Sequence, residues 1–143
     1  HEVSVEEWDL IQRVNVRGAF LFSKMVVPHM IEKRSGNIVN ISSIWGTRGG
    51  PVRSAYITSK FAVIGFTKAL CEDLRPYNIR VNAVCPGPVD TKMMEDLAPE
   101  ANKANWLHPK EIAHVIVELC LPTMFAVNGA VIEAFGKGKP VGL

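Results

Sequence analysis

Apolar and polar residues alternate along the chain with two periods, one typical of amphipathic helices and one typical of short buried strands. The helical period predicts helices from about residue 4 to 33, from 55 to 74 and from 109 to 119 or 120. Short runs rich in β-branched residues predict strands at 37–42, 79–85 and 130–134. Because helices and strands alternate in this order, we expect an α/β domain with a parallel sheet whose strands are buried on both faces.

Four residues are expected to mark the ends or bends of these elements. Ser4 lies three residues before Glu7, the spacing of a helix-capping box, and Pro109 suits the first position of the last helix. Pro28 is expected to kink the first helix, and Gly36 is expected to end it.

The ligand of an open parallel sheet lies beyond the carboxyl ends of its strands. Two of these ends carry unusual residues: Ser42 and Ser43 follow the first strand, and the segment Pro86–Thr91 follows the second. Apolar residues become sparse at 89–107, where we expect a long loop with at most a short helix. A segment of this kind often covers a binding site.

Tyr56 and Lys60 are four residues apart at the start of the second helix, so they lie on one face of it, one turn apart. An ammonium group in this position stabilises a phenolate and makes a tyrosine usable as a general acid or base. The alternative is that both residues decorate a solvated helix face, because this spacing alone is a weak signal. Ser43 at a strand end, 13 residues before Tyr56, and the Pro-Gly turn after the next strand favour catalysis.

Five segments of the chain resemble the short-chain dehydrogenase/reductase family, and together they cover nearly the whole length. These segments are Trp8-x5-Val14-Asn15-Val16, residues 36–43, 56–60 and 79–87, and Val89-x-Thr91. The resemblance implies a Rossmann-like, doubly wound parallel sheet, of which about three strands and three main helices are present here. It also implies reversible hydride transfer between NAD or NADP and a small-molecule alcohol or ketone.

The resemblance assigns a role to each matching residue. Tyr56 matches the catalytic acid/base, Lys60 the partner that stabilises the phenolate and binds ribose, Ser43 the substrate-orienting hydroxyl, and Asn15 the helix asparagine of a proton relay. Tyr56 and Lys60 also belong to the cofactor-binding set, with four residues that match the contacts to the nicotinamide ring: Pro86, Gly87, Val89 and Thr91. Ser42 is not the matching serine, because Ser43 has the family's spacing to Tyr56.

The glycine-rich turn and the helix that hold a dinucleotide pyrophosphate in a complete family member have no match here. By resemblance the sequence begins just before the helix that carries Asn15, so we expect residues 1–143 to be the C-terminal catalytic part of a single domain. About the first two-fifths of that domain, its dinucleotide half, would be missing. The glycines at 46, 49, 50, 136 and 138 do not substitute for it.

Two functions are therefore compatible with the sequence. The first is an NAD(P)-dependent oxidoreductase, which the presence of Asn15, Ser43, Tyr56 and Lys60 favours. The second is a non-catalytic fragment or pseudoenzyme that acts only through association, which the missing half favours. Without that half, we expect residues 1–143 alone not to turn over a substrate, and an apolar sheet edge at 38–41 to be open.

The composition of the chain argues against nucleic acid, a membrane or a metal ion as a binding partner. The chain has 143 residues, 48% of them hydrophobic, and a net charge of +2 with its basic residues spread out, so neither disorder nor nucleic-acid binding is expected. No apolar stretch approaches the roughly 18 residues that span a membrane. Three widely spaced cysteines fit reduced thiols and a cytoplasmic location, and the histidines lack metal-ligand spacing, so no metal is expected.

The segment 19–27 is apolar around most of its predicted helix, more than one face packed on a sheet requires. Together with the family resemblance, this favours a homodimer or homotetramer. Arg48 and Arg53 could meet an anionic substrate or belong to a solvated loop, and Trp45 could line a pocket or pack in the core. These alternatives stay open at the level of the sequence.

Overall fold

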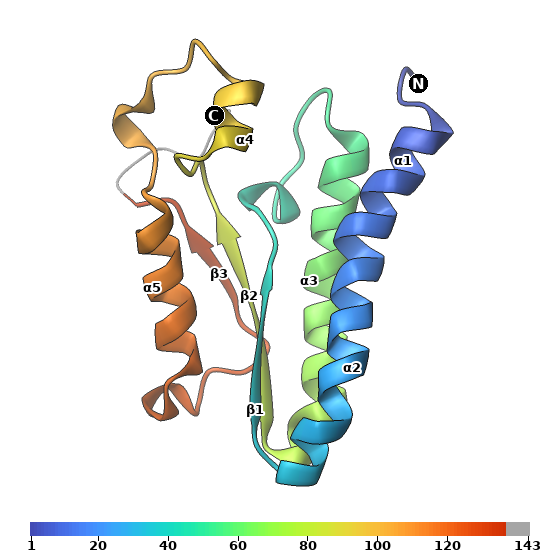
Figure 1. Ribbon diagram of the computed structural model, residues 1–143, viewed down its shortest axis with the longest axis vertical. Coiled ribbons are helices and arrows are strands. Elements are labelled where there is room, and N and C mark those ends of the chain that lie inside the picture. The colour runs from blue at the N-terminus through green and yellow to red at the C-terminus, as the bar shows by residue number, and fades with distance from the viewer. Residues whose placement is uncertain (137–143) are drawn as a thin grey trace.

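The sheet consists of three parallel strands in the order β1 (Gly36–Ile41), β2 (Ile79–Pro86) and β3 (Val131–Ala134). In this computed structural model, which describes residues 1–136, the carboxyl ends of the strands lie together at the top of Figure 1. The register places Ile41 opposite Val84. Residues that follow β1 and β2 therefore meet at one edge, as the sequence predicts. The tail beyond Gly136, including Gly138, lies outside the described residues.

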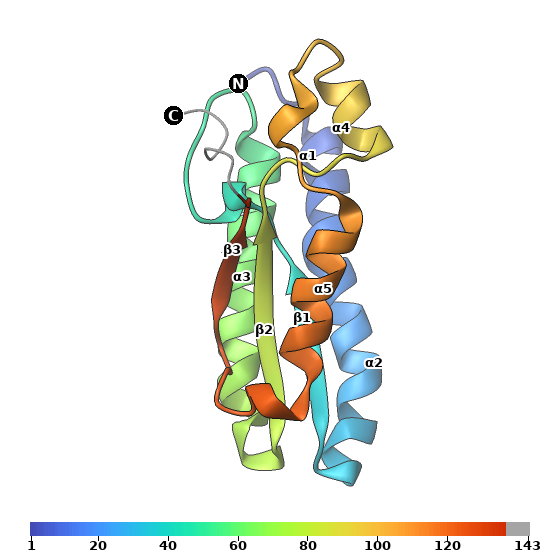
Figure 2. The same ribbon diagram turned by 90° about the vertical axis from the view of Figure 1, so that its left-hand side faces the viewer.

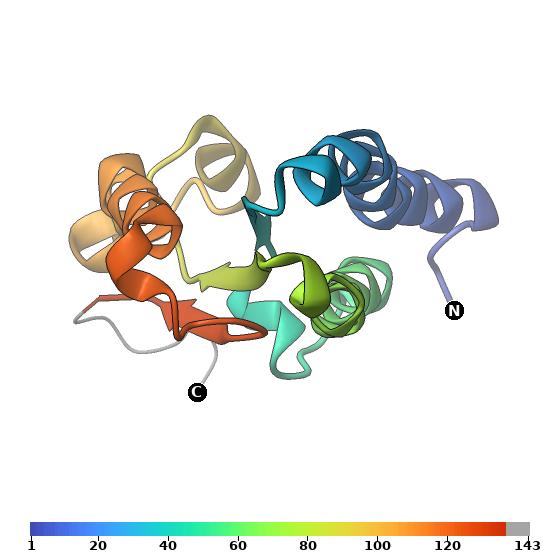
Figure 3. The same ribbon diagram turned by 90° about the horizontal axis from the view of Figure 1, so that it is seen from below.

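Helices cover both faces of the sheet, as in a doubly wound fold. Figure 3 shows α2 (Gly18–Lys33) and α3 (Ser54–Leu74) on one side and α5 (Pro109–Cys120) on the other. Helix α1 (Val5–Gln12) extends the line of α2, and α4 (Lys92–Leu97) lies beyond the carboxyl ends of the strands. The Rossmann-like α/β arrangement expected from the sequence is confirmed.

The central strand β2 separates two apolar cores, because its side chains alternate between the faces of the sheet. Ile79 and Val81 pack with Ile38 and with side chains of α2 and α3. Val84 packs on the opposite face with Ile112 of α5. Both valines are completely buried, which fits a strand covered on two sides.

The expected helix starts are confirmed. The Ser4 hydroxyl accepts a hydrogen bond of 3.1 Å from the Glu7 backbone amide, and α5 begins at Pro109. His108 caps α5, since its imidazole nitrogen accepts from the Lys110 amide at 3.2 Å. The region 89–107 is irregular except for α4 and one short 3₁₀ turn, in line with the prediction.

The hydrogen-bond pattern of the first helix changes at residues 13–17, where the sequence predicts no irregularity. A π-helical turn, Arg13–Arg17, joins α1 to α2, and α2 continues through Pro28 to its end. Pro28, where a kink is expected, lies inside α2 and does not end it. A proline costs one backbone hydrogen bond inside a helix, and here tertiary packing on the sheet outweighs that cost.

Gly36 does not end the first helix. Arg34 takes the left-handed conformation that closes α2, with φ 50°. Gly36 instead begins β1, where a Cβ atom would lie 2.6 Å from the Met30 sulfur. Glycine at this position leaves room for the Met30 side chain between β1 and α2 and does not serve a left-handed turn.

Arg80 on β2 fixes the chain that leads from α5 to β3. Its guanidinium donates hydrogen bonds of 2.8 to 3.4 Å to four backbone carbonyl oxygens, those of Leu119, Leu121, Met124 and Val127. The last carbonyls of a helix lack partners within it, and a guanidinium carries five donors. One side chain therefore satisfies the end of α5 and the turn that follows it.

We predict that Arg80→Met lowers the free energy of unfolding by about 2–4 kcal/mol, because carbonyls that were bonded to a charged donor lose it. Urea unfolding followed by circular dichroism measures this change. Arg75→Met is the control, because the pair of Arg75 and Glu72 is exposed and such pairs contribute little to stability. Equal unfolding midpoints for the two variants would contradict the role of Arg80.

Candidate active site

Three of the expected catalytic residues lie at the carboxyl edge of the sheet, where β1 gives way to α3. Ser43 follows β1 by two residues, and Tyr56 and Lys60 lie in the first turns of α3. Lys60 Nζ donates to the Ile41 carbonyl oxygen at 3.2 Å, and the Ser42 hydroxyl donates to the Lys60 carbonyl oxygen at 2.8 Å. These two hydrogen bonds tie the start of α3 to the end of β1 beside Ser43.

Lys60 provides a partly buried positive charge. Burial lowers the pKa of its ammonium below the ordinary lysine value. Cys85 lies near it and is completely buried, and burial raises the pKa of this thiol, so the thiol is neutral near pH 7 and supplies no counter-charge. Lys60 Nζ lies 5.6 Å from the centroid of the Tyr56 ring. The ammonium is therefore held close to the phenol by its position one helical turn away.

The Ser43 hydroxyl is oriented by the short turn that it begins. Ser43 has an extended backbone and caps a 3₁₀ turn, Ile44–Gly46, by accepting a hydrogen bond of 3.2 Å from the Trp45 amide. Among the described residues, no acceptor is bonded to the hydroxyl proton of Ser43. The proton is thus available to a ligand at the edge of the sheet.

Gly46 lets this turn lie directly against α3. A Cβ atom at Gly46 would lie 2.3 Å from the Ser42 hydroxyl oxygen and 2.9 Å from the Lys60 carbonyl oxygen. Any side chain here would push the turn away from the helix that carries Lys60. Ser42 and Ser43 are both buried, but the Ser42 hydroxyl is engaged with the backbone of α3, which leaves Ser43 as the candidate serine for a substrate.

Asn15 reaches the same helix from the π-helical turn. Its side-chain amide donates to the Ser59 hydroxyl at 3.0 Å, and that hydroxyl donates to the Tyr56 carbonyl oxygen at 2.7 Å. Asn15 is therefore linked to the first turn of α3 through Ser59 and not directly to Lys60. Ser59 is completely buried and was not singled out from the sequence. π-helical turns are frequent at functional sites.

The segment expected to contact a nicotinamide ring leaves β2 at the same edge. Pro86 is the last residue of β2, and the Gly87 amide is hydrogen-bonded to the end of β3 at 2.9 Å. Val89 forms a bridge with Leu107, and the Thr91 hydroxyl caps α4. These contacts fix the first residues of the segment beside the strand ends and anchor it to the far end of the irregular region.

The arginines of the loop after β1 have different surroundings. Arg48 Nη2 lies 2.9 Å from Glu133 Oε2 on β3, so its charge is matched within the protein. A hydrogen bond from the Thr47 hydroxyl, aided by Arg48, lowers the pKa of the Glu133 carboxyl. Arg53 lies over the Trp45 ring, 5.7 Å from the centroid. Arg53 is the arginine of this loop that could face an anionic group.

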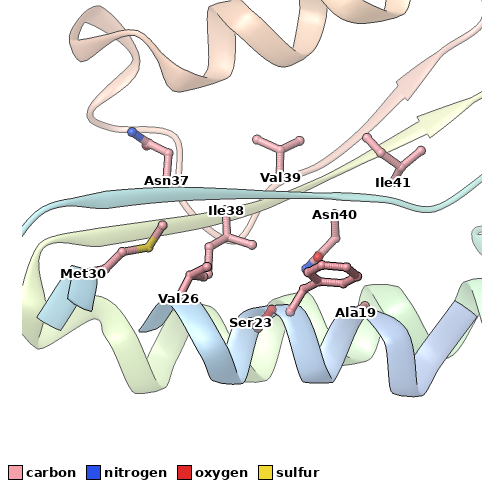
Figure 4. Close-up of a pocket in the computed structure, with 10 residues that line it drawn as sticks. Ala19, Ser23, Val26, Met30, Asn37, Ile38, Val39, Asn40 and Ile41 are labelled. Carbon is pink, nitrogen blue, oxygen red and sulfur yellow. The ribbon is translucent and has the colours of Figure 1, made fainter. Parts of the chain in front are cut away.

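A separate groove runs along the open side of β1. Figure 4 shows it between side chains of α2, including Ser23, Val26 and Met30, and side chains of β1, including Ile38 and Asn40. Within the described residues β1 pairs only with β2, so its other edge is free, as expected from the sequence. None of Ser43, Tyr56 and Lys60 lines this groove, so it is distinct from the candidate active site.

Two further features bear on the kinds of ligand. Within residues 1–136, no group of three or more His, Cys, Asp or Glu side chains is placed to share a metal ion. No helix in the described part of the chain has the length and apolarity that crossing a membrane requires.

Comparison with known proteins identifies the family. Residues 1–102 match the family model described as short chain dehydrogenase, and the chain belongs to this family. The family and the fold expected from the sequence are therefore confirmed.

Two curated relatives illustrate the similarity. The chain is 42% identical over 139 residues to a 3-oxoacyl-[acyl-carrier-protein] reductase of Thermotoga maritima, covering 92% of this chain and 56% of that protein. It is 47% identical over 145 residues to a cyclopentanol dehydrogenase of a Comamonas species, covering 94% and 58%. The chain thus spans a little over half the length of these relatives.

Solved structures of dehydrogenases and reductases share the fold of this chain. An actinorhodin polyketide ketoreductase with NADPH superposes with a TM-score of 0.88 at 32% identity, covering 94% of this chain and 60% of that one. A 4-hydroxyisoleucine dehydrogenase complexed with NADH gives a TM-score of 0.82 at 29% identity, covering 96% and 63%. The expected cofactor class, NAD or NADP, is confirmed for the family fold that this chain shares.

We predict that Lys60→Met leaves the protein without bound cofactor as stable as the native protein at pH 7, or more stable. The folded-state pKa of Lys60 is lowered, so folding carries a penalty for the buried ammonium at pH values below that pKa, and the penalty shrinks as the pH rises toward about 10.4. Urea midpoints at pH 7 and 9 measure this. Lys68→Met on the exposed side of α3 is the control, and a large loss of stability in Lys60→Met alone would contradict the argument.

Proposed function

We propose that this chain is the C-terminal catalytic part of a single Rossmann domain that transfers a hydride between NAD or NADP and an alcohol or carbonyl substrate. The observation that carries the proposal is the junction of β1 and α3. There a partly buried ammonium, bonded to the last carbonyl of β1, lies within 5.6 Å of the Tyr56 ring centroid. A serine hydroxyl with a free proton begins the adjacent turn.

In this proposal Tyr56 is the acid/base. During reduction of a carbonyl, its hydroxyl gives a proton to the substrate oxygen, and during oxidation of an alcohol it takes the proton back. Lys60 stabilises the phenolate that remains. Ser43 donates a hydrogen bond to the same substrate oxygen as negative charge develops on it. Asn15, through Ser59, holds the first turn of α3 in place.

The residues present fit a nicotinamide dinucleotide. Among the described residues, Lys60 Nζ makes one hydrogen bond, to Ile41, so two of its three N–H donors remain for ribose hydroxyls. The segment with Pro86, Gly87, Val89 and Thr91 offers backbone groups for a carboxamide at the next strand end. When bound, the cofactor supplies or accepts the hydride. The chain's own residues orient the substrate and move the proton.

The substrate belongs to the class of small alcohols and ketones, because the site offers hydrogen bonds to a single oxygen. Arg48 is paired with Glu133, which leaves Arg53 as the cation of this loop nearest to Tyr56 in sequence. The three described cysteines are free thiols, which supports a reducing compartment, and we propose the cytoplasm.

A homodimer or homotetramer is part of the proposal. Helices α1 and α2 expose large apolar side chains, of which Phe22 and Met25 are 75% and 77% exposed. Phe61 on α3 is also exposed, so exposed apolar side chains occur on three helices. Exposed large apolar side chains gathered on neighbouring helices are characteristic of a protein interface.

We predict that Tyr56→Phe in the full-length protein lowers turnover by about 10³-fold or more, because the transferable proton is lost, while NADH and NADPH still bind. Oxidation of either cofactor is followed with 3-oxoacyl thioesters, cyclopentanone and acetoin, and cofactor binding is followed by fluorescence. Tyr77→Phe, in the 3₁₀ turn that follows α3, is the matched control. Ser43→Ala should mainly lower turnover.

The alternative function, association without catalysis, makes the opposite prediction. Cofactor oxidation would then be absent in the native protein with every substrate, or equal in the native protein and in Tyr56→Phe. Either result would end the assignment of Tyr56 as the acid/base.

We predict that the full-length protein is a dimer or tetramer at micromolar concentration, and that Met25→Lys shifts it toward a smaller species. Light scattering coupled to size exclusion measures the mass. Glu32→Lys on the same helix is the control for added positive charge. A monodisperse monomer for the native protein would contradict the proposed assembly.

A further inference from the structure

Glu133 joins β3 to the loop that follows Ser43. Its carboxylate accepts a hydrogen bond from the Thr47 hydroxyl and two from Arg48 Nη2, at 3.0 Å to Oε1 and 2.9 Å to Oε2. The partners are 85 and 86 residues apart in the sequence. Figure 2 shows the loop after β1 lying beside the carboxyl end of β3.

Glu133 has a definite place in the sheet. It lies opposite Cys85 in the register of β2 and β3. Because strand side chains alternate, it shares a face with Val131, which packs with Ile64 of α3 and with Cys85. This is the face on which α3 carries Tyr56 and Lys60. The loop after β1 therefore crosses the end of β2 to reach Glu133.

The residues that Glu133 holds continue directly into the turn that Ser43 caps. The Thr47 amide donates to the Ile44 carbonyl oxygen at 3.2 Å, and the Gly46 amide donates to the Ser43 carbonyl oxygen at 2.8 Å. The Trp45 amide donates to the Ser43 hydroxyl. A displacement of Thr47 is thus transmitted to Ser43 through three hydrogen bonds of one short turn.

The contact differs from an ordinary surface ion pair, which contributes little. The side chains of Arg48 and Glu133 are 26% and 31% exposed, whereas those of Arg75 and Glu72 are 57% and 68% exposed. A hydroxyl and a guanidinium from adjacent loop residues converge on one carboxylate. The loop is therefore fixed at two consecutive positions.

We propose that Glu133 is a positioning residue for Ser43: by holding Thr47 and Arg48, it fixes the turn that aims the Ser43 hydroxyl at the substrate oxygen. The inference rests on the proposed function, in which Ser43 donates to that oxygen. Glu133 itself touches neither substrate nor cofactor in this role. A hydroxyl displaced by about 1 Å loses much of its effect on a transition state.

Hydrogen–deuterium exchange and kinetics of Glu133→Gln in the full-length protein test the proposal, with Glu72→Gln as the matched control. We expect the amides of residues 44–48 to exchange faster in Glu133→Gln than in the native protein or the control. The turnover number falls by about 10- to 100-fold, while the dissociation constant of NADH is unchanged. In a Ser43→Ala background, Glu133→Gln causes no further loss of turnover.

Unchanged exchange at 44–48, or a further loss of turnover in the Ser43→Ala background, would overturn the proposal. If the amides of β2 also exchange faster, the whole Glu133→Gln protein is destabilised. Arg48→Met and Thr47→Val are then measured instead, again for amide exchange at 44–48 and for turnover in the Ser43→Ala background. Failure of the proposed function is distinguishable. In that case Tyr56→Phe and Ser43→Ala leave turnover unchanged, whereas failure of this inference alone leaves those two variants impaired.

Discussion

The burial of one ammonium group at the junction of β1 and α3 is the constraint on which the rest of the site depends. Taking Lys60 partly out of water is unfavourable unless a polar partner meets it, and the Ile41 carbonyl is that partner. Ile41 is the last residue of β1, and the Ser42 amide that follows it still donates to the Val84 carbonyl oxygen of β2. This hydrogen bond fixes where the Lys60 ammonium lies relative to the end of the strand.

A second polar contact keeps this relation fixed further down the sheet. The Asn40 side-chain amide donates to the Thr67 hydroxyl at 2.9 Å, in a place where both residues are buried. Positions 40 and 42 point to the same face of β1, and each is bonded to α3, Asn40 to Thr67 and Ser42 to Lys60. A shift of α3 along the strand would break both bonds and leave buried polar groups without partners. Polar contacts thus set the alignment that apolar packing alone would leave loose.

Periodicity and strand-end reasoning were sufficient for the elements and for the placing of Ser43, Tyr56 and Lys60. Parallel strands bring their carboxyl ends together, so residues that follow them converge whatever the details. Ser59, Glu133 and the π-helical turn were not predictable in this way. Ser59 looks like an ordinary helix serine, and Glu133 meets its partners across more than 80 residues without a local pattern. The role of Gly36 was predicted wrongly because glycine is typical both of helix ends and of places where another side chain packs closely, as Met30 does here. The sequence alone does not distinguish these two reasons for a glycine.

The number of residues in the π-helical turn Arg13–Arg17 sets how α1 is rotated relative to α2. Each residue of an α-helix advances the helix by about 100°, so a turn that holds one extra residue rotates everything before it relative to everything after it. Helix α1 contacts α3 through the Gln12 amide, which donates to the Ala55 carbonyl oxygen, while α2 faces the sheet. The first half of the helix, α1, therefore contacts α3, and the second half, α2, packs on the sheet. A single-residue deletion within this turn would restore a regular helix and turn Gln12 away from α3, so chain length here is part of the specification of the fold.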